Sequence, residues 1–81
     1  MPASVYILRS ELNDRFYIGF ALDAERRLLD HNAGRVKSTR HLRPWTKVYE
    51  EHFENATSAR QREYQLKSMK SRKFIENLIA Q

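Results

Sequence analysis

The sequence contains no cysteine, only two glycines and two prolines, and no long apolar run. Without cysteine, the chain forms neither disulfides nor a thiolate zinc site, which excludes the disulfide-rich secreted class and fits a reducing compartment. No apolar stretch approaches the ~20 residues that a membrane-spanning helix needs. The opening MPASVYILRSE lacks the basic and apolar regions of a signal peptide. We therefore expect a soluble, cytoplasmic protein with no membrane partner.

Several catalytic motifs are also missing. The chain has no HExxH, P-loop or GxGxxG sequence, and no serine stands in a nucleophile-elbow context. The three histidines lie at positions 31, 41 and 52 and do not have metal-binding spacing among themselves. These absences exclude zinc proteases, NTPases, dinucleotide enzymes and α/β-hydrolases. They also leave no binding motif for a small-molecule cofactor.

Positive charge is what the sequence does have. Fifteen Lys and Arg against ten Asp and Glu give a net charge of +5 over 81 residues. A chain of this length builds one core, so we expect a single domain over residues 1–81. The charge indicates a polyanionic partner, with nucleic acid first and an anionic membrane surface second.

The pattern of apolar residues, turns and caps predicts the element order β-β-α-β-α-α. Two β-prone segments flank the polar turn ELND, and a third follows a basic loop. Helices are expected between Asp23 as N-cap and Gly34 as C′ residue, from Asn55, Thr57 or Ser58 to about Met69, and after Ser71. The predicted strands are 5–8, 16–20 and 45–53. We therefore expect an α+β fold in which helices cover one three-stranded antiparallel sheet.

Both strands of the predicted hairpin carry a tyrosine. With a four-residue loop at 11–14, Tyr6 faces Gly19 and Leu8 faces Tyr17, which puts the two tyrosines on one face. Two aromatic residues packing in the core are one interpretation. A glycine inside a strand also marks the close approach of a ligand or another backbone, so a functional pair is the other.

Two polar features on the predicted helices stand near apolar stripes. Arg27 and His31 are four residues apart and share a face beside the first helix's stripe, where they suit either phosphate binding or an ordinary helix end. Glu63 lies inside the second helix's inward stripe, and an inward carboxylate needs a partner. That partner is either a cation, with Arg62 and Lys67 as neighbours in sequence and Arg27 as the candidate for a salt bridge, or a divalent metal ion. The stripe consists of Ala56, Ala59, Leu66 and Met69.

The ordered set VYIL, YIG, ERRLLDHN, STR, VYEE and SARQREYQLK resembles the GIY-YIG nuclease superfamily. It is most similar to the small stand-alone bacterial proteins of the YhbQ-like (UPF0213) group. The resemblance runs from Val5 to about Ile79. It implies a three-stranded antiparallel sheet flanked by helices and metal-dependent cleavage of phosphodiester bonds in DNA. The first motif departs from the family, since it reads Val5-Tyr6-Ile7, although its tyrosine is kept.

The resemblance also implies a catalytic set. Tyr6 and Tyr17 match the motif tyrosines, with Tyr6 as the first choice of general base and Tyr17 as the residue that positions or shares the proton. Arg27 is the phosphate-stabilising arginine, His31 accepts or relays a proton, and Glu63 holds a Mg²⁺ or Mn²⁺ ion.

The expected nucleic-acid contacts lie outside that set. Lys37, Thr39, Arg40 and Arg43 in the basic loop are expected to hold the nucleic-acid backbone without reading sequence. Asn77 on the third helix loosely matches an asparagine near the phosphate in some relatives. A module that binds nucleic acid without cutting it is the alternative, and a basic adaptor for proteins is the least favoured. We expect a role in DNA repair or processing.

Overall fold

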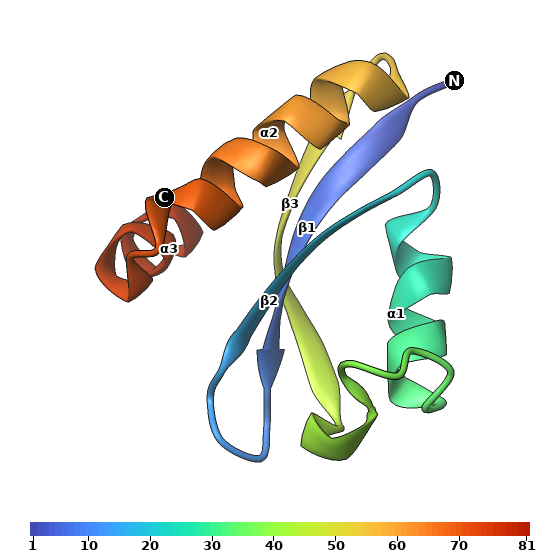
Figure 1. Ribbon diagram of the computed structural model, residues 1–81, viewed down its shortest axis with the longest axis vertical. Helices are drawn as coiled ribbons and strands as arrows, with labels where there is room; N and C mark the ends of the chain where they lie inside the picture. Colours follow the sequence, from blue (N-terminus) through green and yellow to red (C-terminus); the bar gives the residue numbers. More distant parts are fainter.

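The computed structural model describes residues 1–81 and contains the predicted order of elements (Figure 1). A short 3₁₀ helix, Arg40–Leu42, precedes the third strand. The fold is α+β, as expected, and no helix has the length and apolar character required to cross a membrane. The elements are β1 (Ala3–Ser10), β2 (Phe16–Ala21), α1 (Ala24–Asn32), β3 (Trp45–Phe53), α2 (Ala56–Met69) and α3 (Arg72–Ile79).

The sheet is antiparallel with the strand order β2-β1-β3, so β1 is central and β2 is an edge strand. The predicted hairpin register is confirmed, because Tyr6 pairs with Gly19 and Leu8 with Tyr17. The backbone N–H of Ser10 donates to the carbonyl of Arg15 over 2.8 Å, which closes the four-residue loop. The observed β1 extends two residues beyond the predicted strand at each end.

The two faces of the sheet build two separate clusters. Val5 and Ile7 of β1 point to one face and pack with α2 and α3, including Leu66 and Ile75. Tyr6 and Leu8 point to the other face, where α1 covers them. Side chains alternate along a strand, so β1 supplies both clusters and is buried almost throughout. The helices accordingly lie on opposite sides of the sheet (Figure 1).

The helix ends follow the capping residues that the sequence offers. Asp23, Asn55 and Ser71 each accept a backbone hydrogen bond at the start of α1, α2 and α3. Asn55 is thus the cap among the three alternatives for the second helix. Gly34 has a positive φ of 81° just after α1, a backbone conformation that glycine adopts without strain.

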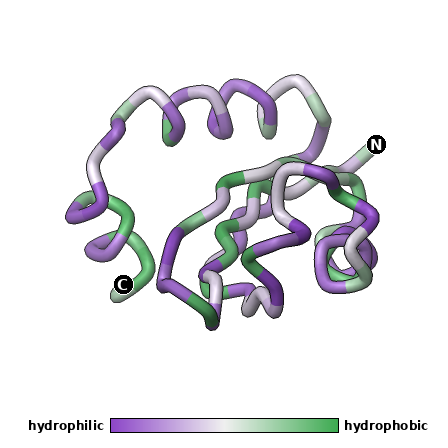
Figure 2. Tube along the Cα trace, turned by 60° about the horizontal axis from the view of Figure 1, so that its bottom comes forward, coloured by the Kyte–Doolittle hydropathy of each residue, from purple (hydrophilic) through white to green (hydrophobic).

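The inward stripe of α2 is shorter than expected. Ala59 and Leu66 are buried, but Met69 is 45% exposed. The chain turns at Lys70, and Ile75 and Leu78 of α3 then take over the covering of the core. Figure 2 shows α2 as a mostly hydrophilic helix with isolated apolar positions.

Replacing Leu66 with alanine tests how far α2 holds the core. Leu66 is 1% exposed, so Leu66→Ala leaves a cavity and we expect it to lower the free energy of unfolding by about 2–5 kcal/mol. Leu29→Ala is the matched control, because Leu29 is 63% exposed and should change stability by about 0.5 kcal/mol or less. Urea denaturation followed by circular dichroism measures both. Equal losses in the two variants would contradict this description of the core.

Candidate active site

Tyr6 lies in the middle of the central strand with its ring buried under α1. Its residue is 1% exposed, and its hydroxyl lies 2.9 Å from Nε2 of His31. His31 occupies the last turn of α1 and is itself fully buried. The sequence distance between the two is 25 residues, and the packing of α1 against the sheet brings them together.

The other ring nitrogen of His31 continues the same chain. Nδ1 lies 2.8 Å from the hydroxyl of Thr39, which in turn lies 3.4 Å from the carbonyl oxygen of Val36. The carbonyl only accepts, so the Thr39 hydroxyl donates to it and accepts from Nδ1. Nε2 is then the acceptor for the Tyr6 hydroxyl. This assignment satisfies every contact with a neutral imidazole.

Tyr17 lies beside this pair and is more accessible. It is half-buried, with its ring centroid 6.4 Å from that of Tyr6 and 4.8 Å, edge-on, from that of His31. The indole of Trp45 packs against its other side at 6.3 Å. The predicted placement of both tyrosines on one face is confirmed by these contacts.

The pKa of Tyr6 is raised to about 12, first by burial and second by the neighbouring Tyr17. The positive charge of Arg27 acts in the opposite direction and lowers that pKa, whereas the carboxylate of Glu63 raises it. The pKa of the Tyr6 hydroxyl is therefore affected by both the Arg27 cation of α1 and the Glu63 carboxylate of α2.

The pKa of His31 is lowered, first by burial and second by the charge of Arg27. Asp30 opposes this shift only in part. The histidine is thus held in its neutral form at neutral pH, as the hydrogen-bond assignment requires. Arg27 itself is about half-exposed, and its one ion pair is the 3.8 Å contact with Asp30.

Glu63 lies on α2, which packs on the other face of the sheet from α1. Its side chain is 22% exposed and forms an ion pair of 3.1 Å with Lys67, one turn later on α2. Its partner is therefore Lys67; the Arg62 guanidinium instead binds Glu51 of β3 with two 3.0 Å bonds.

The donor set suits a magnesium-type ion. No group of three or more histidine or acidic side chains surrounds a common point. Magnesium is commonly held by one or two carboxylates, with waters and substrate phosphate filling the remaining positions. Glu63 supplies one partly buried carboxylate. The residues present therefore fit such an ion.

Gly19 makes room for the tyrosines themselves. A Cβ at this position would lie 2.5 Å from the Tyr6 hydroxyl oxygen and 2.9 Å from Cε2 of Tyr17. The sequence indicated the close approach of a ligand or another backbone at Gly19. In the structure the atoms that approach it are those of the two phenol rings.

The expected nucleic-acid contacts in the basic loop divide into two kinds. Thr39 is 2% exposed and holds His31, so its side chain is not available to a phosphate. Arg43 is exposed, but its Nε donates to the carbonyl of Arg40 and its guanidinium lies against Gly34. Lys37 and Arg40 have exposed side chains that form no ion pair in this structure.

Asn77 lies apart from these residues. It is exposed on α3, a helix that packs on the opposite face of the sheet from α1.

Two contacts that the sequence did not indicate hold the loop in place. The Asn32 side-chain amide donates to the carbonyl of Trp45 over 3.0 Å and accepts from its N–H over 2.6 Å. The indole N–H of Trp45 donates to the carbonyl of Thr39 over 2.9 Å. Together these bonds fix the loop that carries Thr39 against α1, and no short-range pattern predicts them.

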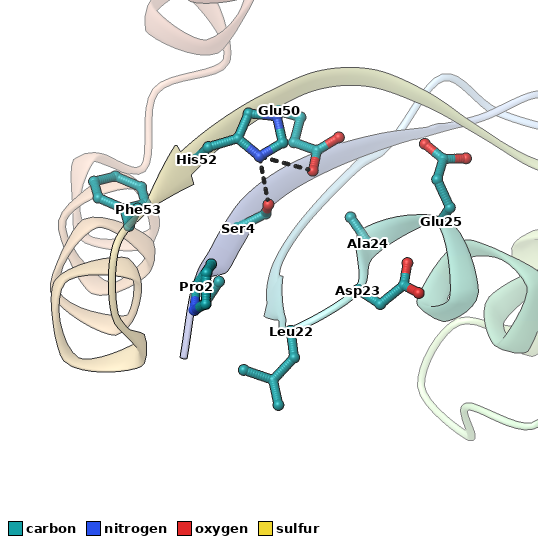
Figure 3. Close-up of a pocket in the computed structure, with 10 residues that line it drawn as sticks. Pro2, Ser4, Leu22, Asp23, Ala24, Glu25, Glu50, His52 and Phe53 are labelled. Carbon is teal, nitrogen blue, oxygen red and sulfur yellow. Dashed lines mark hydrogen bonds and ion pairs between the residues drawn. The ribbon is translucent and has the colours of Figure 1, made fainter.

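A groove of about 300 Å³ lies near the N-terminal ends of β1 and α1, and it has the wrong charge for a polyanion (Figure 3). Asp23, Glu25 and Glu50 contribute carboxylates to its lining. His52 contacts Ser4 over 3.1 Å and Glu50 over 3.6 Å through the same nitrogen, Nδ1. The histidine therefore does not link the serine and the glutamate as a catalytic triad does.

The family follows from a direct comparison. A model described as the GIY-YIG catalytic domain matches residues 2–77. The chain belongs to the GIY-YIG family. In this GIY-YIG domain, the hydroxyl of Tyr6, in the first motif strand, faces Gly19 of the second, and the two motif tyrosines lie together.

Relatives of similar length support this assignment. A UPF0213 protein of Natronomonas pharaonis is 39% identical over 77 residues, which cover 94% of this chain and 88% of the relative. A UPF0213 protein of Staphylococcus saprophyticus is 36% identical over 73 residues, covering 89% and 88%. The solution NMR structure of a UPF0213 protein from Bacillus halodurans matches with a TM-score of 0.62 and 32% identity, covering 99% and 84%. These similarities establish the family and the fold.

Gly19→Ala tests the packing of the GIY-YIG tyrosines. The added methyl group overlaps the Tyr6 hydroxyl, so we expect the free energy of unfolding to fall by about 1–3 kcal/mol. The ring signals of Tyr6 and Tyr17 should shift in NMR spectra. In the double variant Gly19→Ala/Tyr6→Phe the closest atom is gone, and part of the loss should return. A single variant as stable as the wild type, with unmoved ring signals, would contradict this role of the glycine.

Proposed function

We propose that the protein is a divalent-metal-dependent endonuclease that hydrolyses phosphodiester bonds in nucleic acid, with DNA as the first substrate and repair or processing as its role. One observation carries the proposal. The Tyr6 hydroxyl is hydrogen-bonded to a neutral His31 and feels the charges of both Arg27 and Glu63. A proton acceptor, a cation and a carboxylate around one phenol are the groups that phosphoryl hydrolysis requires.

Arg27 is proposed to bind a non-bridging oxygen of the scissile phosphate. Its side chain is 42% exposed, and its contact with Asp30 at 3.8 Å is weak. A guanidinium presents several N–H donors in a plane, which matches the phosphate oxygens. A preorganised donor of this kind typically contributes ~10²–10³ in rate.

Exposure favours a division of labour between the tyrosines that differs from our first choice. Tyr6 has almost no surface for water, whereas Tyr17 is half-buried at the same place. We assign Tyr17 to contact with the attacking water. Tyr6 lies behind it and is hydrogen-bonded to His31. The Tyr6 hydroxyl gives its proton to Nε2 of the neutral His31, to which it is hydrogen-bonded, and takes up in exchange the proton that the water releases through the Tyr17 hydroxyl. Thr39 stabilises the resulting imidazolium by orienting the ring through Nδ1.

Glu63 would hold the divalent ion, with water and phosphate oxygens as the other ligands. When bound, such an ion offsets charge that develops on the phosphate and on the leaving oxygen. Lys67 holds the carboxylate in place through its ion pair.

Cleavage assays on variants of the proposed site residues and of one neighbouring residue test the proposal. We expect wild-type protein to cut single-stranded, duplex or branched DNA with Mg²⁺ or Mn²⁺ and not with EDTA. Arg27→Ala and Glu63→Ala should each reduce the rate by about 10²-fold or more. Arg26→Ala is the matched control, because Arg26 is the exposed neighbour of Arg27 and should keep wild-type cleavage.

Two outcomes would contradict this function. Cleavage that persists in Glu63→Ala would remove the metal ligand from the proposal. Binding of all three DNA forms without any cleavage would instead support a module that binds nucleic acid and does not cut it. Circular dichroism of each variant shows whether a lost activity reflects lost folding.

The pH dependence of cleavage tests the role of His31. Its pKa is lowered from the ordinary value of 6.5, so the neutral form persists to a lower pH. We expect the rate to be constant above about pH 6.5 and to fall as the pH drops through the lowered pKa of His31. His31→Gln should remove this acidic limb and lower the plateau. The matched control His41→Gln, at an exposed histidine, should keep the limb, and an unchanged limb in His31→Gln would contradict the assignment.

A further inference from the structure

A second groove lies between β2 and the junction of α2 and α3. It has a volume of about 260 Å³, and its lining contains no acidic residue. Four of its nine lining residues are cations, four are apolar, and the last is Ser71. The cations are Arg15, Lys67, Lys70 and Arg72, and the apolar floor consists of Phe16, Ile18, Leu66 and Ile75.

The charge of this groove is only partly neutralised by the protein. Arg15 and Lys70 form no ion pair, whereas Lys67 pairs with Glu63. Arg72 uses Nε for Glu76 and Nη1 for the carbonyl of Asp14, and its guanidinium lies 4.4 Å from the centre of the Phe16 ring. Its Nη2 has no partner. Unneutralised cations over an apolar floor attract an anionic chain.

The groove shares the edge strand β2 with the candidate active site and lies on the opposite face of the sheet. Along β2, Phe16 and Ile18 face the groove, and the alternate residues Tyr17 and Gly19 face Tyr6. Lys67 lines the groove and contacts Glu63 at the same time. The groove and the tyrosines thus lie on opposite faces of one edge strand, and a chain lying in the groove reaches Arg27 by passing around the open edge of β2.

We propose that this basic groove binds the backbone of one nucleic-acid strand next to the scissile phosphate. The proposal rests on the proposed function for the meaning of that phosphate, and it adds where the rest of the strand lies. Positively charged grooves with an apolar or aromatic floor are the usual way in which proteins track single strands. The acidic groove near Glu25 and Glu50 repels the same ligand. The principal grip then lies on the β2, α2 and α3 side, and the loop with Lys37 and Arg40 has a minor part.

The test removes two charges from each candidate surface. The groove variant is Arg15→Gln/Lys70→Asn, in which asparagine suits the left-handed backbone of Lys70 with its φ of 49°. The matched variant Lys37→Gln/Arg40→Gln removes two charges from the loop. The charge-conserving variant Arg15→Lys/Lys70→Arg controls for side-chain identity. The probe is a fluorescein-labelled 20-residue oligothymidylate, and its binding is followed by fluorescence anisotropy in EDTA over a range of salt concentrations.

We expect the groove variant to bind the probe more weakly by on the order of tenfold at low salt. Its plot of log affinity against log salt should be shallower by about 1.4, because each phosphate contact to a single strand contributes about 0.7. The loop variant should lose much less, and the charge-conserving variant should bind as the wild type does. Equal losses in the groove and loop variants would overturn the proposal, as would wild-type binding by the groove variant. Preferential binding of labelled polyglutamate over the oligonucleotide, lost in the groove variant, would assign the groove to acidic proteins and overturn it too.

These outcomes are separate from those of the proposed function. Binding in EDTA does not depend on cleavage, so a protein that never cuts still reports on the groove. If Arg27→Ala abolishes cleavage while the groove variant binds normally, the nuclease function stands and the groove assignment falls. If the groove variant cuts at the wild-type maximal rate with a higher KM, both proposals are supported.

Discussion

The hydrogen bond between Tyr6 and His31 is the interaction on which the site depends. It joins the central strand to α1, and the bond from His31 to Thr39 extends the connection to the following loop. Buried polar groups are costly unless they are paired, and no buried side-chain nitrogen or oxygen lacks a partner here. The three groups therefore fix one another's orientation. A change in any of them leaves a buried polar atom unpaired, so the core and the chemistry are coupled.

The edge strand β2 gives the site its access. The central strand is covered on both faces, and a site built on it alone would be closed to any large ligand. β2 has a neighbour on one side only, and its residues are half-buried apart from Gly19. Glu63, from the helix on one face, can therefore act at the edge on Tyr6, which belongs to the other face. Gly19 is the point where the Tyr6 ring, with the Tyr17 ring beside it, lies over β2 without a clash.

The sequence predicts those features that depend on short-range patterns. Turn length and side-chain alternation predicted the pairing of Tyr6 with Gly19, and polar capping residues predicted where each helix starts. The sequence could not predict the contacts of Thr39, because they depend on the path of the loop after α1. That path is set by the two hydrogen bonds between the Asn32 side chain and the backbone of Trp45, which lies 13 residues later in the sequence. The same limit applies to Glu63, whose pairing with Lys67 was not distinguishable by sequence from a pairing with Arg27.

The distribution of charge along β2 gives the substrate a direction. Near Phe16, where the strand starts, the lining of the basic groove carries four cations and no carboxylate. Beyond Ala21, where it ends, the lining of the acidic groove holds Asp23, Glu25 and Glu50, and Lys47 is already paired with the two glutamates. A polyanion that reaches Arg27 is attracted towards the start of β2 and repelled at its end. The net charge of +5 alone would allow either direction. In the proposed nuclease, this uneven placement would hold the strand on one side of the scissile phosphate and repel it from the surface on the other side.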